Sequence, residues 1–158
     1  RIVFWFRIYS ALVRTPLKTI GILLYLRVKS RYGVDISPWA KIGPGFRLMH
    51  GFGVVIGPSV YIGDYCKVFN NATFGKKRPD NAENAMPTVS DFCIVGTGAK
   101  ILGNISVCSY ALIGANAVVL ENITDKLVST RNRPIRVLNE EYVERLKRIK
   151  ASFKEEAL

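Results

Sequence analysis

The most regular part of the sequence is VSDFCIVGTGAKILGNISVCSYALIGANAVV, which runs from Val89 to Val119. Aliphatic residues recur in it at every sixth position, namely Val89, Val95, Ile101, Val107, Ile113 and Val119. A period of six matches neither a helix, which repeats about every 3.6 residues, nor an alternating strand, which repeats every two. It is typical of a solenoid in which three six-residue turns complete one coil and the aliphatic residues stack inside.

The same period extends back to Ile36 and is interrupted twice. Two extra residues fall within 52–55, just after His50, and about nine more fall in the segment Lys76–Pro87. This second segment is polar and contains proline and asparagine, which predicts a loop ejected from the solenoid. Uninterrupted repeats would suffice for a scaffold, so the two interruptions mark where we expect a functional site.

The composition is that of one globular domain, with 158 residues, 49% of them hydrophobic, and a formal charge of +11. The single histidine, His50, excludes zinc sites built from several imidazoles, so we expect no metal. The three cysteines show no paired spacing, which favours free thiols in a reducing compartment. We therefore expect a cytoplasmic protein.

The positive charge is concentrated at the N-terminus, where residues 1–34 contain seven Lys or Arg and no acid. The nearly neutral middle of the chain does not favour nucleic-acid binding. Pro16 should divide the N-terminal segment into two short helices, neither long enough to span a bilayer. Two interpretations stay open: a basic amphipathic surface lying on anionic lipid at the inner face of the cell membrane, or a helical cap over the end of the following domain.

Three parts of the chain follow from these patterns. Residues 1–33 form a basic helical segment, residues 34–128 form the solenoid with its inserted loop at 76–87, and residues 129–158 form a C-terminal extension. In this extension Asn139 should begin an amphipathic helix. The expected fold class is an all-β solenoid, a left-handed parallel β-helix with short N-terminal helices and a C-terminal α-helix.

The repeats and their flanks resemble the hexapeptide-repeat acyltransferases, and within them the serine O-acetyltransferases, over about residues 33 to 137. The matching stretches include 34–36, 41–43, 48–51, 54–57, 96–105, 113–120 and 133–136. The resemblance implies an acetyl-CoA-dependent acetyltransferase that forms a homotrimer, with acetyl-CoA bound in a groove between adjacent solenoids.

In that branch an aspartate precedes the catalytic histidine by fifteen residues, as Asp35 precedes His50 here. Because fifteen is three short of an eighteen-residue coil, the two residues should lie on neighbouring coils near one corner. The resemblance implies that His50 is the general base and that Asp35 orients its imidazole, which can then accept a hydroxyl proton near neutral pH. The hydroxyl would attack the thioester directly, without a covalent enzyme intermediate.

For acetyl-CoA the resemblance implies small residues against the pantetheine arm and a cation at the 3′-phosphate. Solvated turn positions are the alternative interpretation for each of them. The candidate cofactor-binding residues are Gly75, Thr97, Gly98, Lys100, Ala115, Arg133 and Arg136.

The acceptor is where the sequence departs from the serine enzymes. They carry an aspartate just before the catalytic histidine and an Arg-His pair before the proline that follows the loop, whereas this chain has Met49, Ala85 and Met86. Loss of charge-assisted hydrogen bonds predicts poor binding of free serine. We expect Met49, Phe52 and Met86 to contact the acceptor instead.

The run from His50 to Ile56, HGFGVVI, resembles the colanic-acid and capsular polysaccharide acetyltransferases, which also have a short basic N-terminus. The function expected from the sequence is therefore O-acetylation of a saccharide of a capsule, exopolysaccharide or other cell-surface glycan. The first alternative is a serine or other small-molecule O-acetyltransferase, and the second is a non-catalytic solenoid scaffold.

Overall fold

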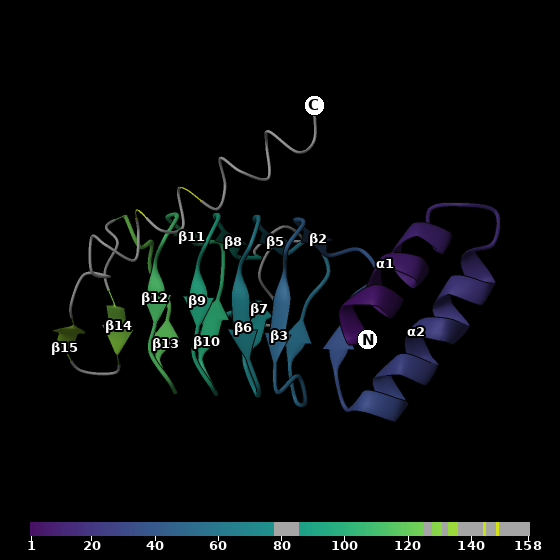
Figure 1. Ribbon diagram of the computed structural model, residues 1–158, viewed down its shortest axis with the longest axis horizontal. Helices are drawn as coiled ribbons and strands as arrows, with labels where there is room; N and C mark the ends of the chain where they lie inside the picture. The colour runs from purple at the N-terminus through teal and green to yellow at the C-terminus, as the bar shows by residue number, and fades with distance from the viewer. Residues whose placement is uncertain (78–85, 125–127, 131–132, 136–143, 145–147, 149–158) are drawn as a thin grey trace.

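The computed structural model describes residues 1–77, 86–124, 128–130 and 133–135, together with residues 144 and 148. Short parallel strands wind into a solenoid, and a helical hairpin closes one of its ends (Figure 1). The predicted fold class, an all-β left-handed parallel β-helix with short N-terminal helices, is confirmed. The predicted C-terminal helix from Asn139 falls largely outside the described residues.

Two helices form the hairpin, α1 (Ile2–Leu12) and α2 (Lys18–Tyr32), and Pro16 lies in the connection between them, as predicted. The buried hydrophobic residues of α1, Phe6 and Tyr9, belong to the same hydrophobic core as the solenoid. Gly33 ends α2 in the left-handed conformation that a glycine adopts without steric cost. The hairpin is therefore a cap on the solenoid, the second of the two interpretations of its sequence.

Three sheets form the three sides of the solenoid. The first sheet contains β1 (Asp35–Ile36), β4 (Val55–Ile56), β7 (Thr73–Gly75), β10 (Lys100–Leu102) and β13 (Val118–Val119). The second contains β2 (Lys41–Ile42), β5 (Tyr61–Ile62), β8 (Thr88–Val89) and β11 (Ser106–Val107). The third contains β3 (Arg47–Met49), β6 (Lys67–Phe69), β9 (Ile94–Val95), β12 (Leu112–Ile113), β14 (Val128–Thr130) and β15 (Arg133–Ile135), the last antiparallel to β14.

The strand register measures both interruptions of the repeat. Val55 pairs with Thr73, eighteen residues later, which is one undisturbed coil. Asp35 pairs with Val55, twenty residues later, and Thr73 pairs with Lys100, twenty-seven residues later. The coil after β1 thus contains two extra residues and the coil after β7 contains nine. Because the strands stay in register on both sides, the extra residues are confined to turns.

The aliphatic residues of the repeat form the core, as their spacing predicts. Ile56, Phe74 and Ile101, consecutive on the first sheet, are at most 1% exposed. Cys66 and Cys93 are buried free thiols in the small interior positions of the repeat. Burying one such aliphatic or aromatic side chain contributes about 1.5–3 kcal/mol, so the stacked interior dominates the stability of the solenoid.

The turns that lead from the third sheet to the first lie above one another along one edge, which we call the shared corner. It consists of residues 50–54, 70–72, 96–99 and 114–117. Besides His50 in its first turn, its left-handed positions alternate between glycine and asparagine, namely Gly53, Asn71, Gly98 and Asn116. A Cβ atom on Gly98 would lie 2.1 Å from Oδ1 of Asn116, on a backbone with a left-handed φ of 71°, so this position favours glycine.

Replacing Gly98 by Ala should lower the free energy of unfolding by at least about 1–2 kcal/mol, because the side chain meets both a left-handed backbone and Asn116. Gly75 is the matched control: its φ is not left-handed, and a Cβ there would meet nothing nearer than 3.9 Å. Gly75→Ala should change stability by less than about 0.5 kcal/mol. Urea unfolding measures both, and equal losses would contradict the assignment of Gly98 to the fold.

Candidate active site

His50 lies on the exposed surface of the first turn of the shared corner, immediately after β3. Its backbone has a φ of 53°, and its carbonyl accepts a hydrogen bond of 2.7 Å from the Phe52 N–H. This tight turn is where the two extra residues enter the coil. His50 therefore lies exposed at the start of the longest turn of the shared corner.

Backbone hydrogen bonds connect the turn of His50 to the turns that carry the predicted pantetheine contacts. The carbonyls of Phe52, Asn70 and Thr97 accept from the N–H groups of Asn71, Gly98 and Asn116, at 3.0, 2.9 and 2.8 Å. Neighbouring strands lie about 4.8 Å apart, so Ala115, three coils from His50, is roughly 15 Å along the same edge. The structure thus brings His50, Thr97, Gly98 and Ala115 onto one continuous corner.

The other predicted cofactor contacts lie elsewhere or are already engaged. The Lys100 ammonium group donates to the carbonyl of Asn71 at 2.7 Å and to Oγ1 of Thr73 at 3.2 Å. Gly75 pairs with Leu102 at the opposite edge of the first sheet, away from the shared corner. Arg133 begins β15, whose side chains are not described, and Arg136 lies outside the described residues.

The three predicted acceptor contacts separate in the structure. Met49 and Phe52 flank His50 and are 36% and 56% exposed. Met86 differs from the prediction because it is buried, with its thioether packed over Gly57 at the other end of β4. Its position follows from the return of the inserted loop into the core before β8. In the described part of the chain, no three His, Cys, Asp or Glu side chains gather into a metal-binding group.

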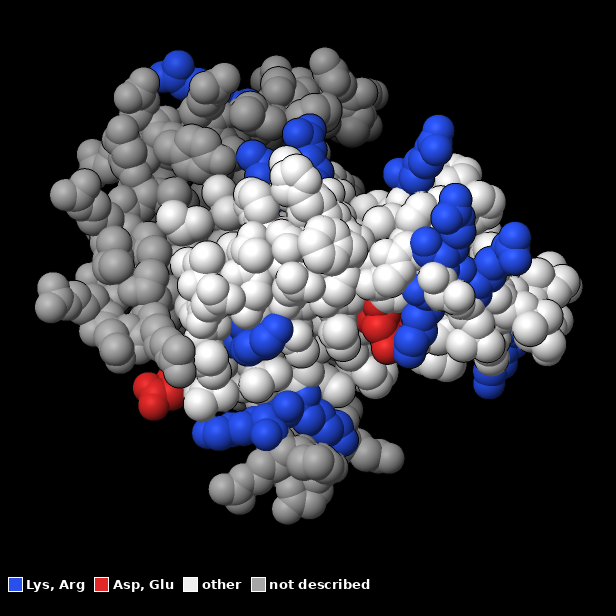
Figure 2. Space-filling model, turned by 90° about the horizontal axis from the view of Figure 1, so that it is seen from below, with Lys and Arg blue, Asp and Glu red and all other residues white. Residues whose placement is uncertain are grey.

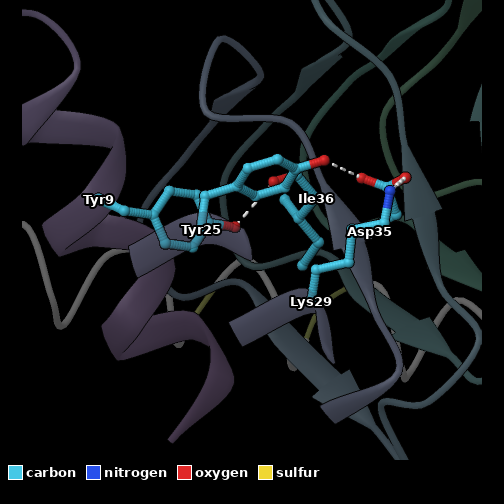
Figure 3. A network of polar contacts seen from close by, with 5 residues as sticks. All are labelled: Tyr9, Tyr25, Lys29, Asp35 and Ile36. Carbon is cyan, nitrogen blue, oxygen red and sulfur yellow. Dashed lines mark hydrogen bonds and ion pairs between the residues drawn. The ribbon is translucent and has the colours of Figure 1, made fainter. Parts of the chain in front are cut away.

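Asp35 begins β1 on the coil next to His50, and its N–H donates to the carbonyl of Val54 at 2.8 Å. The carboxylate does not bond to His50 within the described residues, contrary to the prediction. Instead it accepts hydrogen bonds from the Tyr25 hydroxyl at 2.5 Å and from the Lys29 ammonium at 2.6 Å (Figure 3). Both partners come from α2, one helical turn apart, so they reach the two carboxylate oxygens together.

Sequence reasoning missed Tyr25 and Lys29. Their spacing of four residues predicts that they lie on the same side of a helix. The sequence does not indicate that this side faces Asp35. A second tyrosine, Tyr9 of α1, donates from its hydroxyl to the carbonyl of Ile36 at 2.7 Å. The two helices are therefore attached to β1 through adjacent residues (Figure 3).

The network favours a charged Asp35 and a neutral Tyr25. Partial burial opposes ionisation of Asp35, but the hydrogen bonds from Lys29 and Tyr25 outweigh it and hold the pKa of the carboxyl below its ordinary value. Burial, followed by the hydrogen bond to Asp35, raises the pKa of Tyr25. A negative charge therefore stays on the coil next to His50 throughout the neutral pH range.

The depressed pKa of Asp35 predicts a pH dependence of stability. A carboxyl with a lower pKa in the folded state stabilises above its ordinary pKa, and this stabilisation is lost as the pH falls through the folded pKa. As the pH falls from about 5 to about 3, the unmodified chain should lose the stabilisation that the Asp35 carboxylate provides. Asp35→Asn has no such carboxylate, so its stability should fall less over the same range. Because both partners are partly exposed, water screens the pair and the effect should be small.

Thermal unfolding across this pH range measures the effect, and Tyr25→Phe is the matched variant because it removes one hydrogen bond to Asp35 and keeps the ring. The loss of stability of Tyr25→Phe between about pH 5 and pH 3 should lie between the losses of the unmodified chain and of Asp35→Asn. Identical pH profiles for all three proteins would show that the network does not stabilise the folded state.

Comparison with known proteins relates this corner to one group of enzymes. No protein-family model matches the chain. It is 40% identical over 118 residues to the serine acetyltransferase of Buchnera aphidicola, which covers 75% of this chain and 43% of that protein. Serine acetyltransferase isoform 3 of Entamoeba histolytica, solved in complex with cysteine, superimposes with a TM-score of 0.75 at 33% identity over 90% of this chain.

A serine acetyltransferase solved in complex with CoA superimposes with a TM-score of 0.73 at 31% identity over 85% of this chain. The chain spans 51% and 55% of these two solved proteins, and so about half of the length of its relatives. Sequence and fold together match the hexapeptide-repeat acyltransferases, and the relatives described here are all serine acetyltransferases.

This finding corrects the functional prediction from the sequence. The saccharide acceptor, and with it a role in capsule or exopolysaccharide synthesis, is wrong, because the relatives are serine enzymes. The run His50–Ile56 misled because most of it has a structural explanation: Gly53 needs its positive φ of 65°, and Val54 and Ile56 are buried in the stacked core. The geometry of the coil explains these residues, so they do not indicate which acceptor is used.

Proposed function

We propose that this chain transfers the acetyl group of acetyl-CoA to the hydroxyl of serine or of another small molecule. The observation that carries the proposal is the shared corner, where the single histidine lies exposed in line with Thr97, Gly98 and Ala115. The likeness to serine acetyltransferases over most of the chain supports the same reaction class. Because the chain spans only about half of those proteins, the whole reaction is part of the proposal.

In this mechanism His50 is the general base. Its neutral imidazole accepts the proton of the acceptor hydroxyl while the hydroxyl oxygen attacks the thioester carbon. The tetrahedral intermediate then collapses, the carbon–sulfur bond breaks, and the protonated imidazole returns the proton to the CoA sulfur. The products are the O-acetyl ester and CoA, and the enzyme returns to its starting state without a covalent intermediate. Exposure of His50 on its turn leaves room for both substrates.

Asp35 acts in this proposal as a positioning residue through its charge. Tyr25 and Lys29 hold the carboxylate ionised on the neighbouring coil. A fixed negative charge near the imidazole favours the imidazolium that forms when His50 takes the proton. The helical hairpin would therefore support the reaction, because two of its side chains keep that charge in place.

Acetyl-CoA would run along the shared corner with its thioester at His50. Gly98 has no side chain and Ala115 has only a methyl group, which lets a thin pantetheine arm approach the backbone. A homotrimer, with each acetyl-CoA between two solenoids, belongs to the same proposal. Val55 and Val118, exposed on the outer face of the first sheet, supply apolar surface for such an assembly.

Replacing His50 by Asn should lower turnover of acetyl-CoA with serine by roughly 100-fold to 10,000-fold, the contribution of a positioned base. Asparagine tolerates the left-handed backbone at this turn, so the variant should fold as the unmodified chain does. CoA release, followed with a thiol reagent, measures turnover, and a panel of small hydroxyl compounds beside serine identifies the preferred acceptor.

Asn70→His is a useful control because Asn70 follows β6 as His50 follows β3, so it places an imidazole at the equivalent position one coil further along the corner. In the His50→Asn background it should not restore activity. Unchanged turnover in the folded His50→Asn variant would overturn the assignment of the base, and absence of acetyl-CoA turnover in the unmodified chain with every acceptor would overturn the proposed function.

A further inference from the structure

One surface of the helical hairpin has no role in the proposed reaction. The inner side of α2 places Gly21 and Val28 in the interior and directs Tyr25 at Asp35. The segment also exposes aliphatic residues, each at least half exposed to solvent: Leu17, at the N-terminal end of the helix, and Ile20, Leu23 and Leu26 within it. Large aliphatic side chains gathered on one exposed face are typical of an interaction surface.

Cations are interleaved with these aliphatic residues. Lys18, Arg27 and Arg31 are exposed, and within the described residues no hydrogen bond or ion pair involves their charged groups. Other cations of the hairpin are engaged, since Lys29 pairs with Asp35 and Arg7 donates to the Gly43 carbonyl at 2.5 Å. Figure 2 shows Lys and Arg gathered over the helical end of the molecule. We call Leu17, Lys18, Ile20, Leu23, Leu26, Arg27 and Arg31 the hairpin surface.

A cavity of about 230 Å³ adjoins the hairpin surface between the two helices. Apolar side chains, Trp5, Leu24 and Val28 among them, form most of its wall, and the exposed Arg27 and Arg31 complete it. A hollow with apolar walls and two guanidinium groups matches a phosphate that is joined to an apolar body. That is the chemistry of a phospholipid headgroup where it meets the acyl chains.

We propose that the hairpin surface docks the protein on a bilayer that contains anionic phospholipids. Basic residues interleaved with aliphatic ones attract the negative headgroups and enter the boundary between headgroups and acyl chains. Among the described residues, neither helix is long and apolar enough to cross a membrane, so the docking is peripheral. The inference is independent of the proposed acetyl transfer.

Charge and shape favour a bilayer over a second copy of the chain as the partner of the hairpin surface. Residues 1–34 contain no acid, so two hairpin surfaces facing each other would bring like charges together. The surface lies at one end of the molecule, with α2 outermost and the solenoid extending away from it (Figure 1). A bilayer in contact with α2 would therefore leave the shared corner open to water along most of its length.

Vesicle binding tests the proposal. The full chain should co-sediment with phosphatidylcholine vesicles that contain about one quarter phosphatidylglycerol, and should not co-sediment with pure phosphatidylcholine at about 0.1 M salt. The triple variant Lys18→Gln/Arg27→Gln/Arg31→Gln should bind the anionic vesicles about a hundredfold more weakly. Ile20→Ser/Leu23→Ser should also weaken binding, and it should make the remaining binding more sensitive to salt.

The matched control is Lys41→Gln/Arg47→Gln/Lys77→Gln, which removes three charges from exposed positions outside the hairpin. It should bind as the unmodified chain does, which would show that binding depends on the hairpin surface and not on net charge alone. Circular dichroism confirms that each variant is folded. Failure of the unmodified chain to bind anionic vesicles, or equal binding by the two triple variants, would overturn the proposal. The proposal would also be overturned if the unmodified chain did not bind vesicles but self-associated, and if Ile20→Ser/Leu23→Ser abolished this self-association. The surface would then be an interface between copies of the chain.

Discussion

Buried side chains stack on one another along the inside of each sheet, and this stacking determines the positions of the turns and of the site. On the first sheet this stack is Ile36, Ile56, Phe74, Ile101 and Val119. A register shift of one residue would turn a strand inside out, so every coil must return to the same position after its turns. Extra residues can be accommodated only at corners. The two insertions are consequently displayed at the surface, one of them beside His50.

The shared corner shows how such a stack organises a surface. Alternating glycine and asparagine at its left-handed positions let successive turns approach closely, as Gly98 does beneath Asn116. A row of small, tightly bonded turns then leads from His50 to Ala115. The fold provides in this way a straight edge, with one exposed imidazole at one end, along which a thin extended molecule can lie.

Much of the fold could be predicted from the sequence because the period of six directly encodes stacking. The strand register, the two-residue shift after His50 and the two helices around Pro16 are all local patterns in the chain. The partners of Asp35 could not be predicted, because they depend on how α2 is oriented on the first coil. Nor could the burial of Met86, which depends on how the inserted loop returns to the core. The error about the acceptor has the same origin, since HGFGVVI reflects coil geometry more than substrate.

The helical hairpin contributes to the core, to the proposed active site and to the proposed membrane-binding surface. Its inner side continues the hydrophobic core through Phe6 and Tyr9 and, through Tyr25 and Lys29, fixes the charge of Asp35 beside the shared corner. Its outer side, where cations without a partner among the described residues lie between exposed aliphatic residues, faces away from the solenoid. One small element can thus support a reaction on one side and determine where the protein lies on the other.

A crystal structure of the chain with bound CoA would show whether CoA occupies the shared corner. We expect the CoA sulfur beside the His50 imidazole and the pantetheine arm along the shared corner, past Gly98 and Ala115. CoA bound elsewhere, for example in the cationic groove lined by Arg7, Arg14 and Lys41 between α1 and the first coil, with the shared corner empty, would contradict this expectation.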